Sequence, residues 1–209
     1  MTAINRAIAR VAVLVAGFTP IAWIIWGAFT DNLGANPIDE VQLQTGRWGM
    51  RFLAISLAIS PIRKLTGWNG IIRLRRTFGL FAFFYATLHL INFIAIDKFF
   101  DVGDIVEDIA KHLYITVGMA TWLTLVPLAL TSTRSSIRRL GGKRWNRLHR
   151  LVYVAAVGAT VHYLWAVKKD TLYPLLYLAL FVVLLGYRVW SNRDRLLVRT
   201  KRFQEGGTA

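Results

Sequence analysis

The sequence contains no cysteine, and this absence removes several kinds of chemistry from the chain. Without thiols there is no disulfide, no cysteine-ligated iron–sulfur cluster, no c-type haem attachment and no thiol nucleophile. The sequence also lacks a glycine-rich dinucleotide fingerprint and a phosphate-binding loop. The 19 residues after Trp190 are too few to form a nucleotide-binding fold. Any redox work must therefore proceed without a nucleotide domain in this chain.

Acidic residues are also scarce, with 11 Asp and Glu against 26 Lys and Arg, for a formal net charge of +15. In a soluble protein such a charge would suggest a nucleic-acid partner. Here the basic residues cluster between long apolar runs, so membrane orientation explains them and no nucleic-acid partner is expected.

The chain is rich in apolar residues, which make up 55% of it and include 8 Trp, 12 Phe and 7 Tyr. Several apolar runs reach the length that a bilayer requires, and spans of this kind are helical because lipid offers the backbone no hydrogen bonds. The sequence predicts an all-α membrane protein, a bundle of six transmembrane helices. The predicted spans are 11–29, 47–65, 77–96, 113–131, 148–167 and 172–190.

Charge between these spans predicts their orientation. Basic residues gather at the N-terminus, in 63–76, in 134–150 and in 188–202, whereas most acids lie in the alternate loops. The positive-inside rule then places both termini in the cytoplasm. We expect one domain over 1–209 with its core at 47–190, followed by a basic cytoplasmic tail at 191–209. The acidic outer face would suit a soluble partner that carries a basic patch.

One histidine lies deep within each of two predicted spans. His89 follows Arg76 by 13 residues and His162 follows Arg150 by 12, so they lie about 20 Å and about 18 Å along their helices. Both helices start on the cytoplasmic side, so the two histidines lie at similar depth. An ionisable residue inside a membrane is a functional hypothesis by default. We therefore predict that His89 and His162 are the axial ligands of one haem iron.

Small residues precede both histidines on nearly the same helix face: Ala82 and Ala86 before His89, and Ala155, Gly158 and Ala159 before His162. Such surfaces leave room for a flat porphyrin. They are equally typical of closely packed helices, in which the histidines would only form interhelical hydrogen bonds. The matched depth of the pair favours ligation.

The remaining histidines are less informative. His149 lies about 220° round the helix from His162, and its partner positions on the third span are Arg75 and Arg76, so a second bis-histidine haem is not expected. His149 is either a single ligand or contact of a second cofactor, or an interfacial residue among arginines. His112 is expected to be solvated at the outer end of the fourth span.

Several arginines are candidate contacts for haem propionates, a flavin or a phosphate group. Arg51 lies one turn inside the outer end of the second span, where it could also extend to the lipid headgroups. Arg75 and Arg76 immediately precede the third span. The predicted cytoplasmic loop 138–150 includes Arg144, Trp145 and Arg150, and it could bind the phosphate of flavin mononucleotide (FMN) or, by default, anionic lipid.

Three stretches of the chain resemble the ferric-reductase-like transmembrane family, and most closely its haem-binding subunits of periplasmic methionine sulfoxide reductase systems. They are RRTFGLFAFFYATLHL (75–90), DIAKHLYITVGMATWLTLVPLALTS (108–132) and RRLGGKRWNRLHRLVYVAAVGATVHYLWAV (138–167). His89 and His162 match the family's haem positions and His149 matches its additional histidine. The sequence KHLYITVG departs from the family's Arg-Pro after the lysine, so His112 is not expected to be a family ligand.

This resemblance implies a b-type cytochrome of the inner membrane, with haem b and also FMN. Such proteins pass electrons from quinol or a cytoplasmic flavin reductase to a soluble periplasmic molybdopterin enzyme that repairs oxidised methionine. The chain is then an electron-transfer subunit that does not reduce the substrate alone. Two alternatives stay open: a haem-containing transmembrane reductase of metal ions or oxygen, and a haem-free small transporter or scaffold.

Overall fold

The computed structural model describes residues 3–167 and 170–205, and all regular structure within them is helical. The helices are α1 (Ala3–Phe29), α2 (Pro37–Thr66), α3 (Leu74–Ile91), α4 (Val102–Lys111), α5 (Leu113–Leu130), α6 (Arg134–Leu148), α7 (Leu151–Ala166) and α8 (Leu172–Glu205). A short 3₁₀ helix, η1 (Asn69–Arg73), leads into α3, and a π-helical turn, η2 (Asn92–Asp97), follows it. The predicted all-α class is confirmed.

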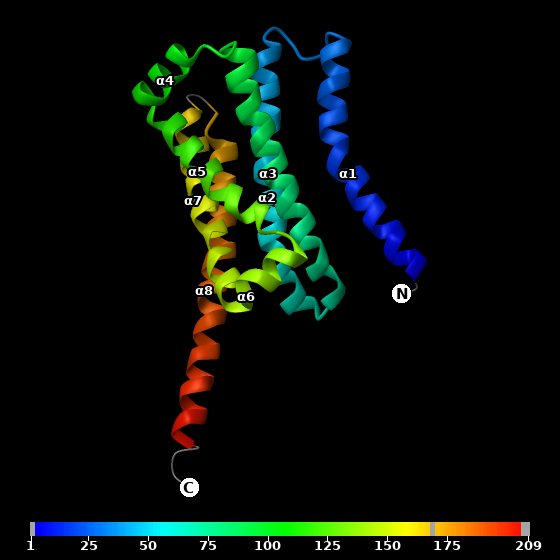
Figure 1. The fold of residues 1–209 in the computed structure, drawn as a ribbon, viewed down its shortest axis with the longest axis vertical. Coiled ribbons are helices and arrows are strands. Elements are labelled where there is room, and N and C mark those ends of the chain that lie inside the picture. The colour runs from blue at the N-terminus through cyan, green and yellow to red at the C-terminus, as the bar shows by residue number, and fades with distance from the viewer. Residues whose placement is uncertain (1–2, 168–169, 206–209) are drawn as a thin grey trace.

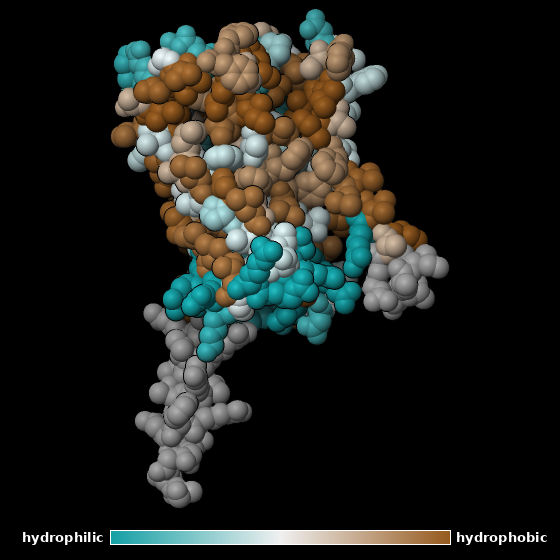
Figure 2. All heavy atoms as spheres, viewed as in Figure 1, coloured by the Kyte–Doolittle hydropathy of each residue, from teal (hydrophilic) through white to brown (hydrophobic). Residues whose placement is uncertain are grey.

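Four helical segments are long and apolar enough to cross a membrane: Ala7–Phe29, Asn69–Asp97, Leu113–Leu130 and Leu172–Ser191. The apolar helix α7 is shorter, at 16 residues. Large apolar side chains such as Trp23, Trp26 and Val183 are more than 60% exposed, which suits a surface in contact with lipid. Figure 2 shows this hydrophobic body with a hydrophilic belt across the end of the bundle where α6 lies. The chain is therefore a membrane protein.

Three boundaries differ from those predicted. Helix α2 begins at Pro37 rather than near 47, because the Asn36 side chain caps it by accepting a hydrogen bond from the Asp39 amide. The predicted loop 138–150 is largely helical, since α6 continues through a kink at Gly141, where φ is +72°. Helix α8 continues beyond 190 to Glu205, so much of the predicted tail extends the last helix.

The transmembrane part of the bundle is built from two closely packed helix pairs, α2 with α3 and α5 with α7. Helix α2 is the most buried element and supplies core residues such as Phe52, Leu53 and Leu57. Helix α8 packs against α2 and α7, whereas α1 packs against α2 on the outside. In Figure 1, α3 and α7 rise in the same direction, and α2 and α5 run in the opposite direction. This arrangement places the ends of α3 and α7 together.

Helix α1 is held to the bundle by an unusual contact with α3. The Tyr85 hydroxyl accepts a hydrogen bond from the Ile21 amide at 3.0 Å and donates one to the Gly17 carbonyl at 2.9 Å. These two backbone groups are four residues apart and would bond each other directly in a regular helix. An inserted side chain and Pro20 are both recognised causes of helix bending, and Figure 1 shows α1 bent partway along.

Candidate functional site

A cavity of about 520 Å³ lies between the two helix pairs and takes its walls from α2, α3, α5 and α7. Its lining is largely apolar and includes Leu43, Met50, Leu53, Met119 and Leu125. Its size falls within the range of about 300–1,000 Å³ that is typical of small-molecule and cofactor sites. The cavity is therefore the main candidate site among the described residues.

The structure brings His89 of α3 and His162 of α7 together in this cavity. Their ring centroids lie 5.9 Å apart and the ring planes are nearly perpendicular, at 84°. The two histidines therefore lie at the same depth, as the spacing from the basic flanks indicated. Metal–imidazole bonds are about 2.0–2.1 Å long, so one metal ion joins ring nitrogens about 4 Å apart. Two imidazole rings at this separation are close enough to bind the same metal ion.

Each imidazole is oriented by a backbone carbonyl of the paired helix. His89 Nδ1 lies 2.8 Å from the Gln42 carbonyl oxygen, and His162 Nδ1 lies 2.7 Å from that of Tyr114. A carbonyl can only accept, so both Nδ1 atoms carry the proton and both Nε2 atoms keep a lone pair. Metal-binding histidines are oriented in this way by their outer-shell partners.

A glycine lies under each imidazole, four residues after the carbonyl that the ring binds. A Cβ at Gly46 would lie 3.1 Å from His89 Nδ1, and a Cβ at Gly118 would lie 2.8 Å from His162 Nδ1. The glycines thus allow each ring to lie against the neighbouring helix. The α2–α3 and α5–α7 pairs have the same arrangement, in which a histidine ring binds a carbonyl of the paired helix and lies against a glycine of that helix. Sequence analysis missed Gln42, Gly46, Tyr114 and Gly118, although a glycine in each of the two stretches QLQTG and YITVG was a visible signal.

One polar side chain, that of Gln42, contacts Nε2 of His89. Its amide nitrogen donates a hydrogen bond to this atom at 3.3 Å, and its amide oxygen accepts one from Asn92 at 2.7 Å. Asn92 is only 2% exposed, and its Oδ1 atom has no hydrogen-bond partner among the described residues. A ligand with a hydrogen-bond donor could bind in the cavity and donate to this buried acceptor.

The small residues predicted to flank a cofactor divide into two groups. Ala82, Ala86 and Ala159 line the cavity. Ala155 is fully buried, and Gly158 packs so closely on α5 that a Cβ there would lie 2.3 Å from Thr121 Oγ1. Ala82, Ala86 and Ala159 therefore leave room for a cofactor, whereas Gly158 allows α5 and α7 to pack closely.

The donor set fits haem better than a bare metal ion. No group of three or more His, Asp or Glu residues suited to a metal occurs among the described residues. Two imidazoles whose Nε2 atoms are acceptors, apolar walls and small side chains are what a b-type haem requires of a protein. His89 and His162 are the residues that would hold it.

The predicted arginine contact at the outer end shifts by one helical turn. Arg47 lines the cavity and donates a hydrogen bond from Nε to Tyr163 Oη at 3.2 Å. Arg51 is not among the cavity residues, and its guanidinium lies 4.3 Å from the centre of the Trp48 ring. Arg47 is thus better placed than Arg51 to contact an acidic group of a ligand.

The remaining predicted residues lie away from the histidine pair. His149 stacks on Trp145 with centroids 3.8 Å apart, and its Nε2 lies 3.1 Å from Thr131 Oγ1. Burial, with a smaller effect of the nearby Arg75, lowers the pKa of His149. The other side chains among these predictions are exposed at the helix ends: Arg76, His112, Arg144 and Arg150. Arg75 lines a second, smaller hollow.

Comparison with known proteins identifies the family of the chain. The family described as "Ferric reductase like transmembrane component" matches residues 45–160, a range that includes His89 and ends two residues before His162. The chain is 52% identical over 180 residues to the protein-methionine-sulfoxide reductase heme-binding subunit MsrQ of Rhodospirillum rubrum, covering 86% of each chain. It is 46% identical over 186 residues to the protein of that name from Herminiimonas arsenicoxydans, covering 87% of this chain and 85% of the relative.

A third relative with the same name, from Xanthomonas oryzae pv. oryzae, is 42% identical over 207 residues, covering 96% of this chain and 94% of its own. Such identity over nearly full length goes far beyond a shared pair of histidines. The chain therefore belongs to the MsrQ family, within the proteins that have a ferric-reductase-like transmembrane component.

Proposed function

We propose that this chain is a b-type cytochrome subunit in which His89 and His162 are the axial ligands of haem b. The observation that carries the proposal is the paired orientation of these two imidazoles, each of which donates from Nδ1 to a helix carbonyl. Each Nε2 atom thereby keeps a lone pair with which it could bind a metal in the same largely apolar cavity. At His89 the metal would replace the Gln42 side-chain amide as the partner of Nε2. The relatives are named as heme-binding subunits, which supports the same assignment.

Haem supplies reversible one-electron chemistry, and the chain supplies its position and surroundings. Gln42 and Tyr114 fix the imidazole tautomers, and apolar residues such as Leu53 and Leu125 exclude water. Arg47 would neutralise an acidic edge of the cofactor at the outer end. Through this site the chain would conduct electrons between the two faces of the membrane.

The proposed topology has six spans, α1, α2, α3, α5, α7 and α8, with both termini in the cytoplasm of a bacterium and the chain in the inner membrane. The basic helix α6 lies at one end of the bundle and the acid-rich helix α4 lies at the other. The positive-inside rule favours the α6 end as cytoplasmic. The histidine cavity includes Asp39, Asp97 and Asp108, so it opens toward the periplasmic end.

The proposed electron acceptor is a periplasmic molybdopterin enzyme, MsrP, which reduces methionine sulfoxide in oxidised proteins. The proposed donor is quinol in the bilayer or a cytoplasmic flavin reductase. The relatives' names place them in a protein-methionine-sulfoxide reductase, which supports this reaction. The acidic periplasmic end would dock a basic patch on the acceptor.

FMN is proposed as a second cofactor at the cytoplasmic end. Trp145 and His149 form a stacked pair there, and Arg144 and Arg150 flank it along the chain. Arg75, beside Arg76 at the start of α3, lies near His149 in space. An aromatic surface beside guanidinium groups suits a flavin ring with a phosphate.

The decisive experiment is haem quantification by the pyridine haemochrome method on purified wild-type protein and histidine variants. We expect His89→Ala and His162→Ala to lose the haem and its low-spin visible spectrum. His149→Ala should affect haem only partly, and His112→Ala serves as the exposed control. Retention of a full low-spin spectrum in either cavity variant would refute the ligand assignment.

A related candidate function is transmembrane reduction of metal ions or oxygen, favoured by the ferric-reductase-like match. The two functions can be distinguished by mixing the chemically reduced cytochrome with purified MsrP, ferric chelate or oxygen and measuring the rate of its reoxidation. Reoxidation that is much faster with MsrP supports the electron-transfer subunit. Reoxidation by ferric chelate or oxygen alone at the same rate supports the reductase.

A further inference from the structure

A second hollow of about 260 Å³ lies at the end of the bundle that carries α6, away from the histidine cavity. It is formed where α2 ends, η1 leads into α3, and α8 passes alongside. Its lining residues are Ser60, Pro61, Arg63, Lys64, Ile72, Arg75, Tyr187, Arg188 and Ser191. Four of these carry a positive charge and none carries a negative one.

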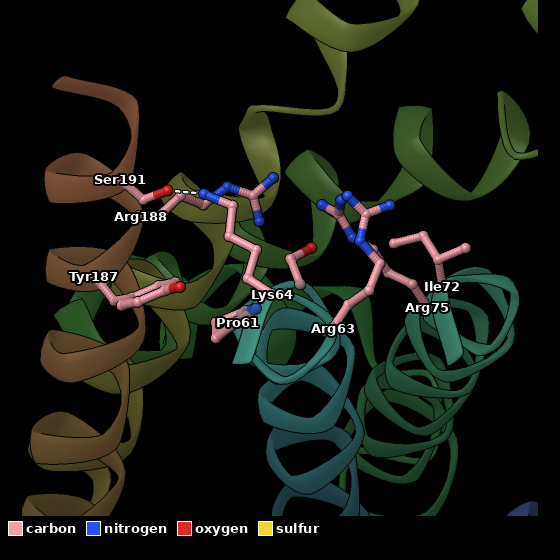
Figure 3. Close-up of a pocket in the computed structure, with 9 residues that line it drawn as sticks. Pro61, Arg63, Lys64, Ile72, Arg75, Tyr187, Arg188 and Ser191 are labelled. Atoms are coloured by element: carbon pink, nitrogen blue, oxygen red, sulfur yellow. Dashed lines mark hydrogen bonds between the residues drawn. The ribbon is translucent and has the colours of Figure 1, made fainter. Parts of the chain in front are cut away.

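Such a cluster is electrostatically unfavourable on its own. Arg75 and Arg188 lie close enough to repel each other, and Arg75 is near the N-terminus of α3, where the helix dipole favours an anion. Figure 3 shows the side chains of Lys64 and Arg188 extending into the hollow from one side and those of Arg63 and Arg75 from the other. Like charges gathered around one space indicate that a negative group neutralises them.

Hydrogen bonding within the hollow leaves donors available. Nη1 of Arg188 is buried and has no partner among the described residues, while its guanidinium lies 5.1 Å from the centre of the Tyr153 ring. Lys64 donates to the Ser191 hydroxyl, and an ammonium group has two further protons to give. Hydroxyls of Ser60 and Tyr187 complete the lining.

We propose that this hollow binds a phosphate group, held by Arg63, Lys64, Arg75 and Arg188 between α2, α3 and α8. A phosphate offers several acceptor oxygens, which arginine binds in a bidentate manner and lysine as a point charge. A carboxylate would satisfy fewer of the donors. The phosphate belongs either to an anionic phospholipid headgroup or to a soluble phosphomonoester such as FMN, and both sources share this chemistry.

Binding here would join the middle of α8 to α2 and α3, since the residues come from all three elements. The site is independent of the haem proposal because none of its residues lines the histidine cavity. Failure of one proposal therefore leaves the other standing.

The test uses the full chain in neutral phosphatidylcholine nanodiscs, to which phosphatidylglycerol, FMN or inorganic phosphate is added. Spin-labelled phosphatidylglycerol reports lipid binding, and flavin fluorescence reports FMN binding. We expect one ligand to bind saturably and to be displaced by high phosphate. Arg188→Gln should weaken binding by about tenfold or more, the value of one lost charge-assisted hydrogen bond. Arg139→Gln, at an exposed position of α6, is the matched control for the lost charge.

The pattern of results identifies the source. Saturable phosphatidylglycerol binding that Arg188→Gln weakens supports a lipid site, and the same pattern with FMN alone supports a phosphomonoester site. Because Arg188→Gln could disturb folding, Lys64→Gln at the exposed rim provides a second test, checked by an unchanged thermal unfolding midpoint. The proposal is wrong if no ligand saturates, or if Arg188→Gln and Arg139→Gln weaken binding equally.

Discussion

Gly118 lies directly beneath the imidazole of His162, so that a Cβ at this glycine would lie 2.8 Å from Nδ1 and 2.9 Å from Cε1. Real Cβ contacts are longer, so either the ring or helix α5 would have to move. Movement of the ring would also break its hydrogen bond to the Tyr114 carbonyl. Gly118 is therefore a positioning residue for the proposed ligand.

We predict that Gly118→Ala lowers haem affinity by about 10- to 100-fold, as other losses of outer-shell positioning do. Gly46→Ala should have a smaller effect because its Cβ would lie 3.1 Å from the His89 ring. Both effects can be measured as the fraction of haem that each variant retains on dilution, monitored by the low-spin absorption band. Gly186→Ala is the control, since a Cβ there meets nothing within 4 Å. Equal haem retention in Gly118→Ala and Gly186→Ala would contradict the prediction.

The depth of the two histidines could be predicted from the sequence because helix rise converts residue spacing into height. The register between neighbouring helices could not be predicted from the sequence, because it depends on long-range packing. For this reason Gly46 and Gly118 were missed although both histidines were found. Hydropathy likewise defined the apolar part of α2 but not its start at Pro37, which is set by the Asn36 cap.

The sequence also could not show which arginine of α2 reaches the cavity. Arg47 and Arg51 are one turn apart and lie on the same side of α2, so the sequence alone cannot tell which one reaches the cavity. In the structure it is Arg47 that lines the cavity. The hollow formed by residues of α2, η1, α3 and α8 was also beyond sequence analysis, because its lining residues are separated by more than a hundred positions.

Gly158 and Thr121 form the closest glycine contact between α5 and α7. A Cβ at Gly158 would lie 2.3 Å from Thr121 Oγ1, so Gly158→Ala should destabilise the pair by about 1–3 kcal/mol, as overpacking commonly does. The unfolding midpoint in detergent measures the loss. Thr121→Ala removes the clashing hydroxyl, so the double variant should recover much of the stability. Without such recovery the contact would not be the cause.

Tyr85 replaces a backbone hydrogen bond of α1 with two of its own. Tyr85→Phe should therefore leave the Ile21 amide and the Gly17 carbonyl unpaired and cost about 1–3 kcal/mol. Faster hydrogen exchange at the Ile21 amide would accompany this loss. Tyr173→Phe removes a hydroxyl from a ring that is 46% exposed and is the control. Slower exchange at Ile21 would instead mean that α1 closes its own hydrogen bond.

The ion pair between Lys98 and Asp108 ties α4 to the end of η2, with 2.6 Å between Nζ and Oδ2. The hydrogen bond from Lys98 lowers the pKa of Asp108 below its ordinary value of 3.8. A lowered carboxyl pKa stabilises the folded arrangement at pH values above 3.8, and the contribution is lost as the pH falls through the lowered pKa. Because the pair is partly accessible to solvent, salt should weaken it as well.

We therefore predict that α4 loosens below about pH 4, the ordinary carboxyl range, and stays docked at neutral pH. The cysteine-free sequence allows a single spin label at Val102→Cys, a position that is 71% exposed. Label mobility should rise as the pH is lowered from 6 to 3. In a Lys98→Met background the label should already be mobile at pH 6, and acid should change it little, because the partner that responds to protonation of Asp108 is gone. If label mobility responds to acid equally with and without Lys98, some other carboxylate holds α4 in place.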